Sequence, residues 1–407
     1  MRKLWLLLIS GYVVFSGYSG ENRYSKEVFL KDTVFSFPVD PETGEQNLEN
    51  LKKIYRDSVS WERSKKEIVE SVLGALGITD IDHGSIPFST IETNVIPKEG
   101  YSVSNIAIQC IEGLWITGNL YIPDSIQQPA PAIISAQGHS VQPAGTNCGR
   151  FTVSSQVMCS MLARMRAVVF NYDMFAYGES GLHAGYKIHS TGLAQSIQTL
   201  TSLRIIDFLQ SLDFVDPERI GMTGASGGGT QTFIASAIDE RIKVSVPVVQ
   251  LSCYFPGGCP CESGRPIHIE ADPNINNAVI SALTAPRAQL IVSDGKDWTQ
   301  TVDRVEYPFI KRIYSFYCAE ESVKNVHLPL EGHDYGPNKR RAMYDFFAEN
   351  FGLSNQGLLS DDGQYKEDEI SVSEWTELLV FPDGKLPENH LDSPDAMYDA
   401  FIRSSRR

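Results

Sequence analysis

A serine lies among glycines in the run GASGG at residues 224–228. The spacing Gly-x-Ser-x-Gly is typical of a nucleophilic serine held on a sharp turn between a strand and a helix. Residues 220–223 predict a short buried strand before the turn, and the residues after it predict a helix, whose N-terminus would offer free N–H groups to a developing oxyanion. The pattern therefore predicts that Ser226 is a nucleophile, and the alternative is an ordinary glycine-rich turn.

A serine hydroxyl is a weak nucleophile unless a base takes its proton and a carboxylate orients that base. His333 is the expected base because it lies on a glycine-containing loop after the last predicted strand; the alternative is a surface-loop histidine. Asp297 is the expected carboxylate, since it follows a predicted strand and a glycine, and Asp294 and Glu262 are the alternatives. Ser, Asp and His then occur along the chain in the order typical of this arrangement.

The oxyanion hole of such a site needs two backbone N–H donors. Gly227 is expected to supply one because it directly follows the nucleophile. His139 is expected to supply the other from the loop after a predicted strand at residues 132–136, and a role for its side chain is the weaker alternative.

Substrate contacts are expected from Arg150, Arg265 and His268, which fall in loops that should border the site. An arginine there would hold a uronate carboxylate or a sugar hydroxyl. The alternative is that these arginines form structural ion pairs. The polar run at residues 173–180 is expected to form a tight turn that shapes the wall of the site.

The elements that must position these residues follow from the hydrophobic pattern. Residues 103–110 and 114–122 alternate in polarity around a Glu-Gly turn, which predicts an antiparallel hairpin. Strands and helices then alternate up to residue 351, which predicts an α/β protein with a mostly parallel, doubly wound sheet and helices on both faces. Because ligands bind at the carboxyl ends of parallel strands, the candidate segments are expected to meet at one edge of that sheet.

The chain has 407 residues, of which 42% are hydrophobic and 21% charged, as in soluble globular proteins. Its net charge of −15 excludes nucleic acid as an expected partner, because phosphate contacts need a basic face. Residues 1–19 combine a positive start, a short apolar run and small residues, which predicts a cleaved secretory signal. The protein is thus expected to be secreted or periplasmic without stable membrane insertion, and an uncleaved N-terminal anchor is the alternative.

The expected organisation is a signal peptide (1–19), an N-terminal extension packed on the main domain (20–95), a catalytic domain (96–353) and a C-terminal arm (354–407). Seven cysteines leave at least one thiol unpaired. Cys259-Pro260-Cys261 with His268 nearby suggests a metal site, but the spacing fits no known zinc pattern, so structural or disulfide roles are favoured. No metal or organic cofactor is expected.

With these segments placed, the chain resembles the α/β-hydrolase superfamily, and within it the bacterial acetyl xylan esterase-like and polysaccharide-esterase branch. The resemblance covers about residues 60–353 and depends on these motifs: WER (61–63), TGNLY (117–121), QGH (137–139), YDM (172–174), GES (178–180), GASGG (224–228) and EGHDYG (331–336).

The resemblance implies an exported serine esterase that removes acetyl groups, or methyl groups of uronic acids, from plant or algal polysaccharides. Related glucuronoyl methylesterases carry arginine after the nucleophile and some acetyl xylan esterases carry glutamine, whereas this chain has Gly227. The residue after the nucleophile therefore favours neither substrate. A peptidase of the same fold and a non-catalytic carbohydrate-binding protein are the rival functions, and a complete set of Ser, Asp and His argues against the second.

Overall fold

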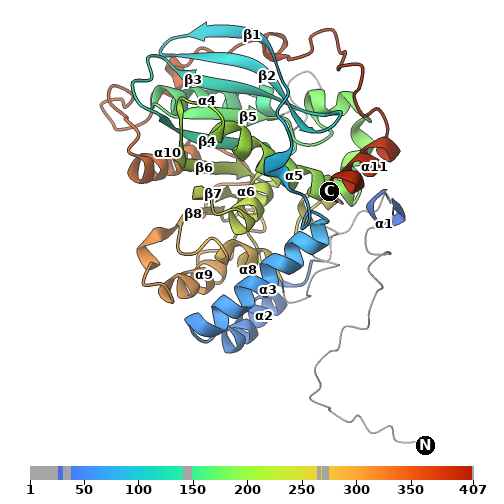
Figure 1. Cartoon of the computed structure of the whole chain (residues 1–407). Helices are drawn as coiled ribbons and strands as arrows, with labels where there is room; N and C mark the ends of the chain where they lie inside the picture. Colours follow the sequence, from blue (N-terminus) through green and yellow to red (C-terminus); the bar gives the residue numbers. More distant parts are fainter. Residues whose placement is uncertain (1–25, 31–37, 141–148, 264–266, 268–274, 406–407) are drawn as a thin grey trace, which may run out of the picture.

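The computed structural model describes residues 26–30, 38–140, 149–263, 267 and 275–405, and within them nine strands form one sheet (Figure 1). The order across the sheet is β1-β2-β3-β5-β4-β6-β7-β8-β9. The strands are β1 (Thr90–Lys98), β2 (Tyr101–Ile111), β3 (Leu114–Pro123), β4 (Ala130–Ala136), β5 (Val168–Tyr172), β6 (Val215–Ala225), β7 (Ile242–Val248), β8 (Ala288–Asp294) and β9 (Val323–Leu328).

Strand direction divides the sheet into two parts. β1, β2 and β3 pair antiparallel with one another, and β3 also pairs antiparallel with β5. From β5 to β9 every neighbouring pair is parallel. The predicted α/β architecture, a mostly parallel doubly wound sheet preceded by an antiparallel hairpin, is confirmed.

Helices cover both faces of the sheet (Figure 1). One face carries α5 (Leu193–Gln210), α6 (Gly227–Ile238), α8 (Asn277–Ala282) and α9 (Glu306–Ser315). Outside them, α3 (Ser58–Leu76) packs on α6 and α2 (Pro41–Ile54) packs on α9. The other face carries α4 (Val153–Arg164) and α10 (Pro337–Phe351). The alternation of a strand divides its side chains between the two cores: Ile134 of β4 packs into the first core and Ile133 into the second.

Two elements near the N-terminus differ from the sequence-based expectation. The sequence pattern predicted no helix at residues 41–54, but α2 occupies Pro41–Ile54 and begins at an Asp40 cap whose side chain accepts the N–H of Thr43. The sheet also begins earlier than expected. β1 starts at Thr90, so the boundary expected after residue 95 falls inside a strand. Most β1 side chains are exposed, which is why its hydrophobic pattern is weak.

The C-terminal residues run back over the domain as far as α11 (Pro394–Ser404), which contacts α1 (Lys26–Leu30) and β2 (Figure 1). On the way, the backbone carbonyls of Glu377 and Leu379 accept from the Asn105 amide of β2. In the described residues, no helix combines the length and apolarity that a membrane crossing would need. The predicted signal at residues 1–19 lies outside those residues.

Candidate active site

Ser226 stands at the junction of β6 and α6 with φ 56° and ψ −125°, a backbone conformation that is strained for any residue except glycine. The turn is tight because strand and helix approach β4 closely. A Cβ added at Gly228 would lie 2.2 Å from the carbonyl oxygen of Ala136, and one at Gly224 would lie 2.5 Å from the same atom. The glycines are therefore required by packing, and the strain presents the serine hydroxyl above the sheet edge.

The Ser226 hydroxyl donates to Oε1 of Glu262 over 3.3 Å. Glu262 is buried in the helical turn α7 (Pro260–Ser263), and its other oxygen accepts the N–H of Gly258 at 2.8 Å. Glu262, an alternative triad acid on sequence grounds, thus contacts the nucleophile directly.

His333 and Asp297 form a close pair at the ends of β9 and β8. Nδ1 of His333 lies 2.7 Å from Oδ2 of Asp297. The other carboxylate oxygen, Oδ1, accepts both the N–H and the hydroxyl of Thr299, each at 2.6 Å. The Trp298 ring packs against the imidazole with centroids 4.4 Å apart. These contacts fix the carboxylate and direct one of its oxygens at the imidazole.

Asp294, the nearest competitor for the role of triad acid, is engaged elsewhere. It is fully buried and its Oδ2 lies 3.4 Å from Nζ of Lys339. Burial raises the pKa of Asp294 above its ordinary value, against the opposing hydrogen bond from the Lys296 N–H and the charge of Lys339. Of the two aspartates, the one that the geometry places against His333 is Asp297.

Lys339 of α10 holds the loop that carries His333. Its buried Nζ donates to the Gly332 carbonyl at 2.6 Å and to the Asp334 carboxylate at 2.7 Å. A second anchor is Tyr335, whose hydroxyl lies 2.6 Å from the Thr223 hydroxyl of β6. Sequence reasoning did not find Lys339, because a lysine in a predicted helix ordinarily faces solvent.

One cavity of about 200 Å³ joins these groups at the carboxyl edge of the sheet. Ser226 and His333 both line it, together with Gly138 and His139 of the loop after β4. Gly138 lies so close to the turn that carries Ser226 that a Cβ on Gly138 would be 2.5 Å from the Ala225 carbonyl oxygen. The expected convergence of the segments after β4, β6 and β9 is therefore present.

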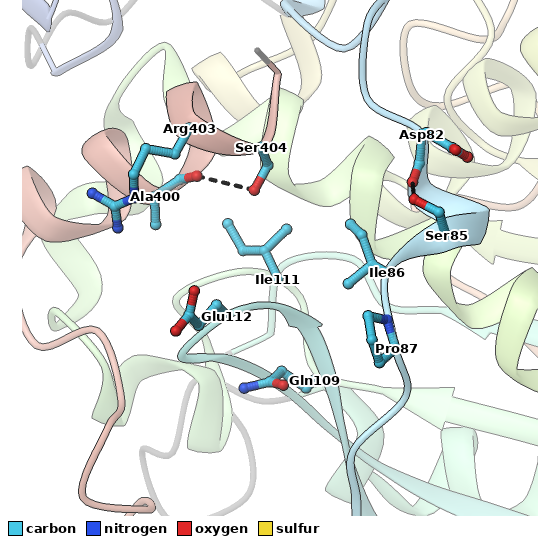
Figure 2. Close-up of a pocket in the computed structure, with 10 residues that line it drawn as sticks. All are labelled: Asp82, Ser85, Ile86, Pro87, Gln109, Ile111, Glu112, Ala400, Arg403 and Ser404. Atoms are coloured by element: carbon cyan, nitrogen blue, oxygen red, sulfur yellow. Dashed lines mark hydrogen bonds between the residues drawn. The ribbon is translucent and has the colours of Figure 1, made fainter. Parts of the chain in front are cut away.

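A larger cavity of about 340 Å³ lies between the turn η1 (His83–Ser85), the β2–β3 hairpin and α11 (Figure 2). Asp82, Glu112 and Arg403 are the charged residues in its lining. Neither Ser226 nor His333 is among its lining residues, so the smaller cavity is the candidate active site.

The two predicted oxyanion donors lie in suitable places. Gly227 is the first residue of α6, and N–H groups in a first helical turn have no partner within the helix. His139 lies beside Gly138 on the cavity wall, and its imidazole Nδ1 is 3.2 Å from Glu262 Oε1. The oxyanion role of each N–H remains a prediction.

Arg150 does not fit its predicted role in substrate binding. Its side chain is fully buried, and its Nε donates to Asp173 at 2.7 Å while an Nη donates to Glu179. A guanidinium enclosed by two carboxylates cannot meet a ligand in the cavity, so Arg150 fits the alternative of a structural ion pair. Arg265 and His268 lie outside the described residues.

Comparison with known proteins relates this geometry to a family. A family model described as acetyl xylan esterase (AXE1) matches residues 85–260. A solved structure described as methylesterase BT1017 is 37% identical, with a TM-score of 0.81, and the match covers 91% of this chain and 80% of that chain.

More distant solved structures share the fold alone. A putative acetyl xylan esterase (BF1801) from Bacteroides fragilis NCTC 9343 is 14% identical over 77% of this chain and 87% of its own, with a TM-score of 0.52. A glucuronoyl esterase from Solibacter usitatus is 16% identical over 73% of this chain and 94% of its own, also with a TM-score of 0.52. The chain therefore belongs to the acetyl xylan esterase-like branch of the α/β-hydrolase superfamily, and it is a carboxylic ester hydrolase of the carbohydrate esterase type.

Proposed function

We propose that this protein is an exported serine esterase that removes ester substituents from polysaccharides through a covalent acyl-enzyme. The observation that carries the proposal is the shared cavity, which is lined by both Ser226, in its strained conformation, and His333, whose imidazole contacts Asp297. A nucleophile, a base and an orienting carboxylate are the groups that acyl transfer requires.

In the proposed mechanism, the Ser226 hydroxyl turns from Glu262 towards Nε2 of His333, which takes the proton as the oxygen attacks the ester carbonyl. Asp297 accepts from Nδ1–H and stabilises the imidazolium. His333 then gives the proton to the departing alcohol, which leaves an acyl group on Ser226. Water, activated by the same imidazole, releases the acid and restores the serine.

The negative charge on the tetrahedral oxygen is expected to be met by the N–H groups of Gly227 and His139. The first lies at the positive end of the α6 dipole. Removing one preorganised donor of this kind raises the activation free energy by about 3–4 kcal/mol. No chemical step in this mechanism needs a cofactor.

For the substrate, we propose a methyl ester of a uronic acid in a plant or algal polysaccharide. The support is the 37% identity with a protein described as a methylesterase. In this case the sugar acid is the acyl group on Ser226 and methanol leaves first. The second candidate is an acetyl ester, which the match to the acetyl xylan esterase family favours; there the acetyl group is carried by Ser226 and the sugar hydroxyl leaves.

A release assay separates the two substrates. The purified protein is given methyl-esterified uronic acid oligosaccharides and acetylated xylan oligosaccharides, and methanol and acetate are measured. We expect methanol release, abolished in the Ser226→Ala variant and blocked by a serine-directed phosphonate whose adduct is found on Ser226. Acetate release alone would transfer the proposal to the second candidate, and a protein without any adduct on Ser226 would contradict the serine mechanism.

A further inference from the structure

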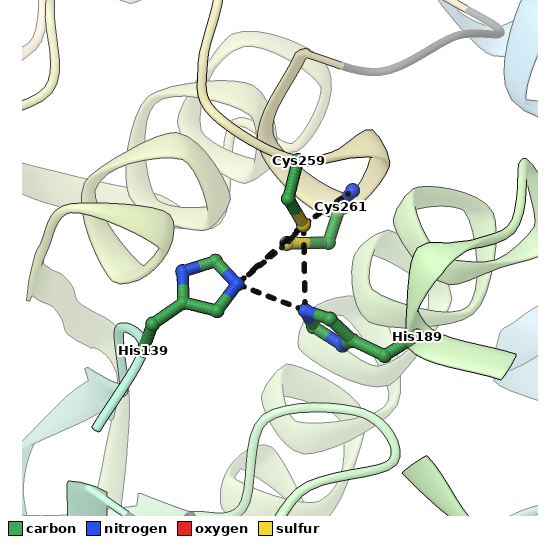
Figure 3. A group of neighbouring side chains, drawn as sticks. All are labelled: His139, His189, Cys259 and Cys261. Carbon is green, nitrogen blue, oxygen red and sulfur yellow. Dashed lines mark hydrogen bonds between the residues drawn. The ribbon is translucent and has the colours of Figure 1, made fainter. Parts of the chain in front are cut away.

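Four metal-ligating side chains meet beside the active site (Figure 3). They are His139 after β4, His189 in the turn η4 (Tyr186–Ser190), and Cys259 and Cys261 at the start of α7. One ligand atom from each lies within 4.8 Å of every other. The two thiols are not joined in a disulfide.

The hydrogen bonds on the far side of each imidazole define which nitrogen faces the cluster. Nδ1 of His189 lies 2.7 Å from the Phe175 carbonyl oxygen, which can only accept, so Nδ1 carries the proton. Nδ1 of His139 lies 3.2 Å from Glu262 Oε1, an oxygen that also accepts from the Ser226 hydroxyl. With Nδ1 protonated in this way, each ring in its neutral form turns an Nε2 lone pair inwards.

These two lone pairs face each other across only 3.0 Å. Two Nε2 acceptors at that distance repel unless a proton or a metal ion lies between them. A histidine whose other nitrogen donates to a carbonyl or carboxylate is also the arrangement found around metal-ligating histidines, because that bond fixes the tautomer and the ring orientation.

The spacing of the ligand atoms is close to that of a tetrahedral zinc site. With Zn–N of about 2.0–2.1 Å and Zn–S of about 2.3 Å, the edges of the tetrahedron are about 3.3 Å for N···N, about 3.5 Å for N···S and about 3.8 Å for S···S. Cys259 Sγ is 3.5 Å from each Nε2, and Cys261 Sγ is 3.4 Å from Nε2 of His139.

The two sulfurs depart from this geometry, being 2.7 Å apart. That separation is longer than the bond of about 2.05 Å in a disulfide and shorter than the tetrahedral edge. Zinc binding would therefore require the two sulfurs to move apart by about 1 Å. The N–H of Cys261 also points at Cys259 Sγ over 3.3 Å, a contact that stabilises a thiolate.

We propose that His139, His189, Cys259 and Cys261 bind one Zn²⁺ ion as a closed Cys₂His₂ site. Two thiolates and two imidazoles match the ligand preference of zinc, and each thiol gives up its proton on binding. Four protein ligands leave no open position for water or substrate, so the ion is structural and takes no part in ester chemistry.

The ion would join three segments that have no sequence proximity, namely the loop after β4, η4 and the start of α7. Glu262 links it to the nucleophile, because the same Oε1 contacts His139 and Ser226. If the proposed function is correct, zinc therefore holds in place the loop whose His139 N–H serves the oxyanion hole, and its loss lowers kcat more than it changes KM.

Metal analysis of the full chain tests the site without reference to activity. After dialysis against metal-free buffer, we expect elemental mass spectrometry to find about one zinc ion per chain. Cobalt added to the chelator-stripped protein should give the intense visible absorption of tetrahedral Co²⁺ with thiolate ligands. Cys261→Ser and His189→Ala should lose the zinc, whereas Cys318→Ser and His390→Gln, which change a thiol and an imidazole elsewhere, should retain it.

Wild-type measurements keep the test decisive even where a ligand variant fails to fold. A stoichiometry near zero, no cobalt absorption, or an intact mass two hydrogen atoms low with Cys259 linked to Cys261 would each overturn the proposal. Zinc that binds with full stoichiometry in a protein that releases neither methanol nor acetate would support the metal site and contradict the proposed function, so the two failures are distinguishable.

Discussion

Replacing Asp297 by asparagine should inactivate the enzyme through the tautomer of His333. In the native site Thr299 donates both its N–H and its hydroxyl to Oδ1 of Asp297. These two donors would hold the amide oxygen of an asparagine in the same place. The amide NH₂ group would then occupy the position of Oδ2 and point at His333 Nδ1, which lies 2.7 Å away.

An NH₂ group facing Nδ1 forces that nitrogen to accept, so the proton moves to Nε2. An imidazole protonated at Nε2 cannot take the proton of Ser226. In a serine protease triad the corresponding change lowers kcat by about 10⁴-fold, and we expect about 10³–10⁴-fold here, equivalent to about 4–5.5 kcal/mol of transition-state stabilisation. KM and the unfolding temperature should change little, because shape and burial are conserved.

The assay is steady-state hydrolysis of the best ester substrate, with the rate of phosphonate labelling at Ser226 as a second measure of nucleophile activation. Asp294→Asn is the matched control: it lies three residues away and pairs with Lys339, so it should reduce stability and leave kcat within about tenfold. The reasoning is refuted if Asp297→Asn keeps a tenth of the wild-type kcat, or if the Asp294 variant alone is inactive.

Three further outcomes are expected. Lys339→Met removes the hydrogen bonds that hold the His333 loop and leaves the Asp294 carboxylate buried without its cation, so the free energy of unfolding measured in urea should fall by about 3–5 kcal/mol and kcat should fall as well. Adding Asp294→Asn should restore stability, and no recovery would count against the pairing of Lys339 with Asp294. Gly228→Ala should lower stability by about 1–3 kcal/mol and abolish activity, because its Cβ would lie 2.2 Å from a backbone oxygen; a stable, active variant would contradict the tight turn. Burial lowers the pKa of His183 from 6.5 to about 4, so the unfolded state binds the proton more readily and stability falls as pH drops from 7 to 4; the wild type should lose about 3 kcal/mol more than His183→Phe over that range, and equal losses would exclude the effect.

Most of the fold was predictable because its pattern is local. Buried runs such as β8 and amphipathic or apolar helices such as α5 can be read from a few neighbouring residues. β1 escaped notice because an exposed edge strand has little hydrophobic alternation, and α2 because its helix depends on an Asp40 cap and few apolar residues.

The site was predictable where a residue's role follows from its place after a strand. The predictions of Ser226, His333 and Asp297 have that origin, and the structure brings the last two into contact. Arg150 was misjudged since the depth of a loop residue is decided by distant carboxylates, which no local pattern records.

Sequence reasoning considered Cys259 and Cys261 as metal ligands but paired them with His268, and it missed His139 and His189 for a related cause. His139 and His189 are 50 residues apart, and each is far along the chain from Cys259. No fixed spacing joins three separate loops, so only their folding against one another reveals the set.

The C-terminal segment has a consequence for the order in which the molecule can be completed. Both oxygens of buried Glu179 accept backbone N–H groups from Val380 and Phe381, and Arg150 donates to the carbonyl of Leu378. During synthesis, Arg150 and Glu179 are made before these backbone partners, which follow Arg150 by more than two hundred residues. A nascent chain that ends before Leu378 thus lacks the backbone partners of Arg150 and Glu179, so this buried network is completed only after residues 378–381 have been made.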